Sequence, residues 1–138
     1  MKNVTIRIAD WIEDKKDLEY IRRQVFINEQ SVPELLEWDE ADSTATHFLA
    51  LVDGKAVATV RLTRQGQIGR MAVLPEYRCQ GIGSKLLGFV IQTATTQNIK
   101  ELFLHAQVSA IPFYAKHGFT VYGDVFYEAY IAPVSYTH

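Results

Sequence analysis

The chain has 138 residues and 48% of them are hydrophobic, so it can bury one core but is too short for two ordinary domains. Its formal net charge of -2 argues against a nucleic-acid-binding protein, which normally carries a net basic patch. No apolar run reaches the length of about 18 residues that a membrane-spanning helix needs, and the N-terminus lacks the apolar stretch of a signal peptide. We therefore expect a single cytoplasmic domain over residues 1–138 that binds neither nucleic acid nor membrane.

The first third of the chain predicts a strand, a helix and an irregular segment. Apolar and polar residues alternate over 3–9, which indicates a strand with one buried face. Apolar residues then recur at helical spacing after Asp14, which indicates a helix that ends near residue 28. Pro33 and the acidic residues after it disfavour regular structure, so we expect a loop or a short helix there.

The middle of the chain predicts three strands and a long helix. Asp53-Gly54, a strong hairpin signal, separates predicted strands at 48–52 and 55–62. A third strand is expected over 68–74, and residues 81–97 place apolar side chains along one helical face.

The last third predicts a strand at 101–107, a helix at 109–117, and closing strands at 119–122 and 125–132. Strands and helices in this order predict an α/β (α+β) fold, in which a mixed, twisted sheet of about six or seven strands has helices on both faces.

Charge is unevenly distributed along the chain. Residues 24–54 contain seven acids and no Lys or Arg, whereas residues 55–85 contain six bases and one acid. Fields of one sign raise the local concentration of ligands of the other sign, so the pattern suits an anionic cofactor beside a cationic acceptor. Two solvated faces that merely balance each other fit the pattern equally well.

Cysteine and histidine placement argues against disulfide and metal chemistry. Cys79 is the single cysteine, which excludes an internal disulfide and suits a reducing compartment. Its place beside Arg78 at a predicted helix start favours a lowered thiol pKa, but no His and acid lie near it in the sequence, so we do not assign it as a nucleophile. The four histidines lack the spacing of metal ligands, and we expect no metal.

A glycine-rich loop between a predicted strand and helix indicates a phosphate-binding site. The helix N-terminus presents unpaired N–H groups and the positive end of the helix dipole to an anion. Gly81 and Gly83 lack the side chains that would keep the anion away. Two common phosphate loops do not fit, because Leu86 replaces the third glycine of the dinucleotide motif and Gly83-Ser84-Lys85 has the wrong order for the mononucleotide loop.

The segment from Arg78 to Gly83 fits the (Gln/Arg)-x-x-Gly-x-(Gly/Ala) signature, and so resembles the GCN5-related N-acetyltransferases (GNAT superfamily), whose loop holds the pyrophosphate of acetyl-CoA. Residues 112–119 resemble the second signature of that superfamily, a short helix and the strand after it. Segments 25–30, 37–47 and 104–107 further resemble its small bacterial ElaA-type branch. The resemblance covers nearly the whole chain, and it implies a GNAT-like fold that binds acetyl-CoA as acetyl donor.

The resemblance also implies which residues hold the donor. Main-chain groups of the strand that ends at Val73 would meet the pantetheine arm and the acetyl carbonyl, where a backbone N–H can polarise that carbonyl. Lys116 would reach a phosphate, although a lysine in a last helical turn is more often simply solvated. The candidate donor-binding residues are Met71, Ala72, Val73, Arg78, Cys79, Gln80, Gly81, Ile82, Gly83, Ser84, Gln107 and Lys116.

Amide formation from a thioester needs a neutral amine, a stabilised oxyanion and a proton for the departing thiolate. The resemblance implies that Tyr114 lies near the sulfur and donates this proton, since a phenol pKa of about 10 keeps it protonated at neutral pH. The alternative is that Tyr114 only packs the short helix against the sheet.

The general base is left open by the sequence. Many relatives place a carboxylate on the strand before the glycine-rich loop, but residues 67–70 contain none. His105 shares a strand face with Gln107 and has a suitable ordinary pKa of about 6.5, although a histidine there is more often a hydrogen-bonded core residue. Glu37 is the second candidate base, and the remaining candidates are Glu29, Asp39, His47 and Glu128. Glu29, Asp39 and His47 are also the candidate acceptor-binding residues; acids such as Glu37 and Asp39 could instead cap a loop.

The leading hypothesis is an N-acetyltransferase that moves an acetyl group from acetyl-CoA to a primary amine of a small molecule, or of a protein, by direct transfer in a ternary complex. One alternative is a CoA-binding sensor or interaction module without transfer activity, which the missing strand carboxylate allows. Another is an acyl-homoserine-lactone-synthase-like enzyme, because Arg23-Gln24-Val25-Phe26 and the acids at 37, 39 and 42 are similar to motifs of that group. A monomer and a homodimer through the closing strands both remain open.

Overall fold

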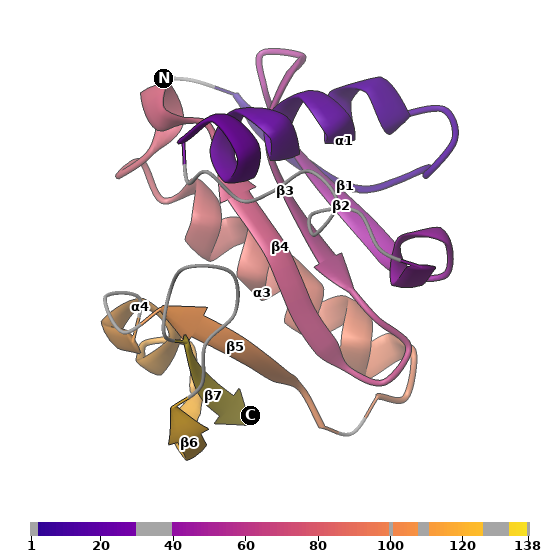
Figure 1. Ribbon diagram of the computed structural model, residues 1–138. Coiled ribbons are helices and arrows are strands. Elements are labelled where there is room, and N and C mark those ends of the chain that lie inside the picture. The colour runs from indigo at the N-terminus through magenta and orange to yellow at the C-terminus, as the bar shows by residue number, and fades with distance from the viewer. Residues whose placement is uncertain (1–2, 30–39, 100, 108–110, 126–132, 138) are drawn as a thin grey trace.

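The computed structural model describes residues 3–29, 40–99, 101–107, 111–125 and 133–137. These residues form one sheet of seven strands in the order β1-β2-β3-β4-β5-β7-β6 (Figure 1). Neighbouring strands are antiparallel except β4 and β5, which are parallel. The strands are β1 (Val4–Ala9), β2 (Thr46–Val52), β3 (Lys55–Leu62), β4 (Gln67–Val73), β5 (Phe103–Gln107), β6 (Thr120–Val125) and β7 (Pro133–Thr137). The predicted mixed sheet is therefore confirmed.

Helices cover both faces of this sheet. Helix α1 (Lys15–Arg22) crosses one face and packs on β3 and β4, and α3 (Ile82–Thr96) lies on the other face against β1, β2 and β3 (Figure 1). Helix α1 continues as the π-helical segment η1 (Arg23–Glu29), a change of winding that its apolar spacing did not indicate. The shorter helices are η2 (Glu40–Ser43), η3 (Pro75–Tyr77) and α4 (Ile111–Ala115). Among the described residues, no helix is long and apolar enough to cross a membrane.

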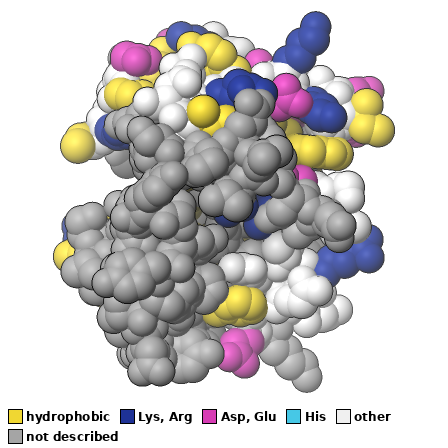
Figure 2. All heavy atoms as spheres, in the orientation of Figure 1, with side chains coloured by type: hydrophobic (Ala, Val, Ile, Leu, Met, Phe, Trp, Pro, Cys, Tyr) yellow, Lys and Arg dark blue, Asp and Glu magenta, His cyan; other side chains and the backbone are white. Residues whose placement is uncertain are grey.

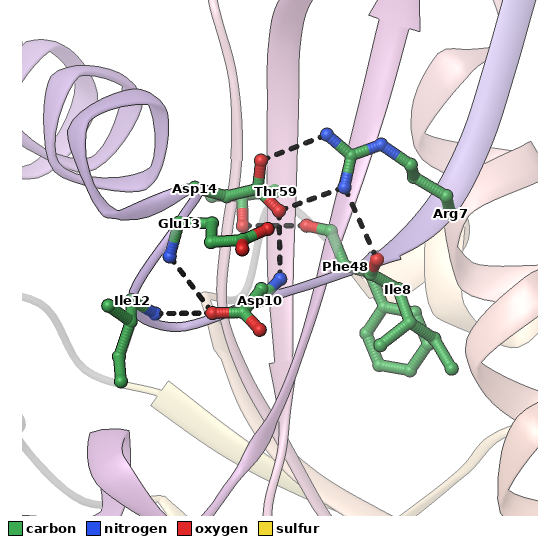
Figure 3. A network of polar contacts seen from close by, with 8 residues as sticks. All are labelled: Arg7, Ile8, Asp10, Ile12, Glu13, Asp14, Phe48 and Thr59. Carbon is green, nitrogen blue, oxygen red and sulfur yellow. Dashed lines mark hydrogen bonds and ion pairs between the residues drawn. The ribbon is translucent and has the colours of Figure 1, made fainter.

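A polar turn connects β1 to α1 (Figure 3). The Asp10 carboxylate accepts hydrogen bonds from the backbone N–H groups of Ile12 and Glu13 at 2.8 and 2.9 Å. Asp14 caps no N–H of α1; its carboxylate instead forms a two-pronged ion pair with Arg7, with both N–O distances 2.9 Å. The Arg7 hydrogen bond, followed by a backbone N–H, lowers the pKa of Asp14 to about 2. This pair ties the start of α1 back to the edge strand.

The core lies where β2 and β3 are enclosed by helices on both sides. Phe48, Leu49, Val57 and Val60 are all fully buried, so these strands read as continuous apolar runs rather than alternating ones. The hairpin between them turns at Asp53 and Gly54, whose φ angles are +51° and +86°, as a type I′ turn requires. Over the upper part of the face in Figure 2, where Figure 1 places α1, basic, acidic and apolar side chains intermingle.

The last strand differs from its sequence prediction. Strand β7 covers Pro133–Thr137, where the sequence predicted no strand; of the predicted strand at 125–132, Val125 ends β6 and residues 126–132 lie outside the described residues. In the structure Pro133 is the first residue of β7, opposite Gln107, a position at which a strand tolerates proline.

Candidate functional site

Strands β4 and β5 separate part of the way along their length. Their parallel ladder contains two pairs, Gln67 with Phe103 and Ile68 with Leu104, although both strands continue. Figure 1 shows them starting together and diverging toward α4. Beyond Ile68, the backbone groups of β4 that face β5 are therefore not used in this ladder.

A β-bulge interrupts β4 in this separated part. The register with β3 shifts between the pairs Thr59 with Ala72 and Arg61 with Gly69, so β4 has one extra residue there. Arg70 lies in the bulge with a φ of +51°, a left-handed conformation that is uncommon for a residue with a side chain. Bulges of this kind redirect main-chain groups and side chains, here those of Arg70 and Met71.

The glycine-rich loop lies directly after β4 and η3. Cys79 and Gly81 have φ angles of +61° and +80°, and both are exposed. Arg78 Nε donates a hydrogen bond to the Val73 carbonyl at 2.9 Å, which joins the loop to the end of β4. Gly81 is the N-cap of α3, and none of the described side chains caps this helix end. The first N–H groups of α3 thus lie beside an exposed loop that carries the basic side chain of Arg78.

This loop fits a phosphate group. A Cβ built on Gly81 would meet no atom of the described residues within 4 Å, so among these residues nothing fills the space next to the helix N-terminus. Gly83 faces the ring of Phe113, which would lie 3.5 Å from a Cβ at that position. An anion at the helix N-terminus would interact favourably with the dipole and the free N–H groups.

Helix α4 brings an aromatic group to the same place. Tyr114 Oη lies 3.8 Å from the Sδ atom of Met71 in the bulge of β4. The Tyr114 ring packs edge-on against Phe113 at 5.0 Å and Phe119 at 6.0 Å. The turn after α4 places His117 Nε2 3.2 Å from Ser84 Oγ in the first turn of α3. The structure therefore brings together three separate segments that carried predicted donor-binding or catalytic residues.

Other predicted site residues are only partly described. Glu37, Asp39 and Glu128 lie outside the described residues, as do the side chains of Glu29, His105 and Gln107. The backbones of His105 and Gln107 lie in β5, two residues apart and so on one face of the strand. Lys116 is exposed in the turn after α4.

A buried charged cluster, formed by Arg22, Asp42, Arg61 and His47, was not predicted. Asp42 Oδ1 lies 2.9 Å from an Nη1 atom of both Arg22 and Arg61. His47 Nε2 is 2.7 Å from the Asp42 carbonyl oxygen, and its ring stacks on Trp11 at 4.5 Å. Since a carbonyl only accepts, Nε2 carries the hydrogen. Burial lowers the pKa of His47, with the Asp42 hydrogen bond opposing this, so the ring is held neutral.

The cluster buries a candidate acceptor-binding residue and pairs charges from the acidic and basic segments of the sequence. His47, a candidate acceptor-binding residue, is 2% exposed. Asp42 and Arg61 belong to the oppositely charged halves of the sequence, yet they neutralise each other inside the fold. No group of three or more His, Cys, Asp or Glu side chains in the described part of the chain is placed to hold a metal ion.

Comparisons with known proteins identify the family. A family model described as an acetyltransferase (GNAT) domain matches residues 12–138. An uncharacterized N-acetyltransferase, YjcF, of Bacillus subtilis (strain 168) is 32% identical over 120 residues, which are 85% of this chain and 86% of that protein. A crystal structure of an acyl-CoA N-acyltransferase from Pseudomonas aeruginosa is 26% identical, with a TM-score of 0.84 and 99% of both chains covered. Escherichia coli ElaA is 23% identical, with a TM-score of 0.84 and 98% of both chains covered.

The chain therefore belongs to the GNAT acetyltransferase family and is an acyltransferase. The superfamily predicted from the two signatures is confirmed, and the likeness to ElaA shows the shared fold.

Proposed function

We propose that this protein transfers an acetyl group from acetyl-CoA to a primary amine of a small molecule, by direct transfer while both substrates are bound. One observation carries the proposal: the Tyr114 hydroxyl lies 3.8 Å from Met71 Sδ in the bulge of β4, beside the uncapped N-terminus of α3. The similarity to the Pseudomonas acyl-CoA N-acyltransferase supports the choice of donor class.

The proposed donor site extends from the glycine-rich loop along β4. The first N–H groups of α3 and the side chains of Arg78 and Lys116 would hold the phosphates, since a helix N-terminus and basic groups both attract anions. Main-chain groups of Met71 and Val73, which β5 does not pair, would hold the pantetheine arm. A backbone N–H aimed at the acetyl oxygen would stabilise the negative charge that develops there.

Acetyl-CoA supplies the acetyl group as an activated thioester. A base first takes a proton from the acceptor's ammonium, and the neutral nitrogen then forms a bond to the acetyl carbon. As the carbon–sulfur bond breaks, the nitrogen loses its surplus proton to solvent and the sulfur gains a proton. Tyr114 is the proposed donor of the latter proton and regains one from solvent. His105 and Glu37 remain the proposed bases, and Glu29 and Asp39 the proposed contacts to the acceptor's ammonium. His47 would act indirectly, since its ring is buried and holds the Asp42 backbone.

The test is to incubate the purified protein with acetyl-CoA and a panel of amines, to follow thiol release and to identify acetylated products by mass spectrometry. Tyr114→Phe removes one hydroxyl and keeps the ring that packs on Phe113 and Phe119. Loss of a general acid typically costs a factor of about 10²–10⁴, so we expect kcat to fall by at least about 100-fold with donor affinity unchanged.

Gln92→Ala, an exposed change further along α3, serves as the control and should retain the activity of the unmodified protein. Turnover by Tyr114→Phe at the rate of the control would remove Tyr114 from the mechanism. CoA binding without any acetylated product from the whole panel would argue against a small-molecule amine as the acceptor.

A further inference from the structure

His117 lies where the segment after α4 meets the first turn of α3. Its Nε2 atom is 3.2 Å from Ser84 Oγ, and its ring packs on Phe113 with centroids 5.2 Å apart. Phe113 in turn faces Gly83, the residue before Ser84. Two successive residues of the proposed phosphate site are thus each contacted by the segment that carries Tyr114.

Ser84 is well placed to contact a phosphate at this helix end. It is the third residue of α3, within the turn whose N–H groups have no intrahelical partner. A serine hydroxyl has one hydrogen to donate and two lone pairs that accept. If His117 accepts the hydroxyl hydrogen, Ser84 cannot donate it to an anion; if His117 donates to Oγ, that hydrogen remains available.

We propose that His117 is a positioning residue for the phosphate end of the acyl donor. It donates from Nε2–H to Ser84 Oγ, which directs the Ser84 hydroxyl hydrogen toward an anion at the N-terminus of α3. The inference rests on the proposed function, in which that anion is the pyrophosphate of an acyl-CoA. It adds a residue outside the predicted donor-binding set, and one that joins the phosphate site to the Tyr114 segment.

The proposal predicts that His117 affects binding of the phosphate end of the donor and not binding of its pantetheine arm. His117→Ala removes the donor to Oγ, and a net hydrogen bond contributes about 0.5–1.5 kcal/mol, so CoA should bind about two- to thirteenfold more weakly. Pantetheine has the thiol arm and no phosphate, so its affinity should be the same in His117→Ala as in the unmodified protein. His117→Gln retains an N–H donor at the end of a side chain of similar reach and should recover part of the lost CoA affinity.

The experiment is to measure the CoA dissociation constant by titration calorimetry, and the pantetheine constant by NMR titration, with no acceptor present. The variants are His117→Ala, His117→Gln, Ser84→Ala and the double variant His117→Ala/Ser84→Ala, with Gln92→Ala as the exposed control. Because His117 acts through Ser84, the double variant should bind CoA no more weakly than Ser84→Ala alone. Thermal unfolding of each variant reports any loss of folding.

Selective loss of CoA affinity, recovery by Gln and non-additivity with Ser84→Ala support the proposal. Equal weakening toward CoA and pantetheine, or additive effects in the double variant, would overturn it and leave His117 a packing residue. Failure of the unmodified protein to bind CoA would overturn the donor assignment together with this inference. Tight CoA binding that is unchanged by His117→Ala overturns the inference alone.

Discussion

His47 shows how burial sets the chemistry of a single residue. The ring is 2% exposed, donates to the Asp42 carbonyl and lies near the guanidinium groups of Arg22 and Arg61. Desolvation, the largest cause, lowers its pKa below the ordinary value of 6.5. Protonation would therefore place a further positive charge inside a cluster that already contains two arginines.

The consequence is a prediction on stability at mildly acidic pH. The folded pKa lies below the unfolded value of 6.5, so the unfolded chain binds more protons between the two. The contribution of His47 is complete above pH 6.5 and is lost as pH falls below that value. We expect the free energy of unfolding, measured with urea between pH 7.5 and pH 5, to fall more steeply in the unmodified protein than in His47→Gln, which keeps a donor for the Asp42 carbonyl. Parallel curves for the two proteins would show that His47 does not titrate on unfolding.

The same cluster could not be predicted from the sequence. Arg22, Asp42 and Arg61 are separated by about twenty residues each, and each residue type is ordinarily exposed. Only the packing of α1 and η2 against β3 brings them together, and no local pattern reports that packing. Arg70 is similar, since nothing in Gly69-Arg70-Met71 indicates a left-handed arginine within a strand.

At the scale of elements, the sequence predicted correctly those turns and loops whose conformation depends on the residues within them. Asp53-Gly54 gave a hairpin at the correct residues because both central positions need positive φ. The loop before α3 was predicted because residues 78–83 follow an apolar run and open an amphipathic stretch, and the helix begins at Ile82. Strand β7 was not predicted, because Pro133 lacks an N–H for a ladder and its place as the first residue of a strand depends on its partner Gln107, which lies in β5.

Gly66 is a position where an element depends on the absence of a side chain. It has a φ of +98°, and a Cβ would lie 2.2 Å from the backbone oxygen of Glu101. Its carbonyl accepts a hydrogen bond from Phe103 N at 3.0 Å, so this turn holds the start of β5 against the end of the β3–β4 connection. Neither contact partner is a flexible side chain that could move aside.

We therefore expect Gly66→Ala to destabilise the fold by about 2 kcal/mol or more, through backbone strain and the clash with a carbonyl. Gly88→Ala in α3 is the matched control, because a Cβ there meets nothing within 4 Å. It should stabilise the protein by up to about 1 kcal/mol, since alanine favours helix. Urea unfolding of both variants tests the pair; a loss in Gly66→Ala no larger than about 0.5 kcal/mol would contradict the contact geometry.

In the whole molecule, a short parallel ladder between β4 and β5 joins two parts of the sheet. β1 to β4 form one antiparallel part and β5, β7 and β6 another, and two ladder pairs join them. Residues proposed to hold the acyl donor lie on both sides of this division, with Met71 in β4 and Tyr114 in α4. A ligand bound there would add contacts where the sheet itself provides few.

CoA should consequently stabilise the molecule unevenly. At a concentration about 100 times its dissociation constant it raises the free energy of unfolding by about 2.7 kcal/mol through mass action alone. Amides that exchange by local opening should gain protection where the ligand contacts the chain, at residues 70–73, 81–84 and 111–118, while those of β1 remain unchanged. Hydrogen exchange followed by mass spectrometry, with and without CoA, measures both regions in one experiment. Protection that is equal in β1 and in the first turn of α3 would mean that CoA stabilises the fold only globally, and it would argue against a donor site between the two parts of the sheet.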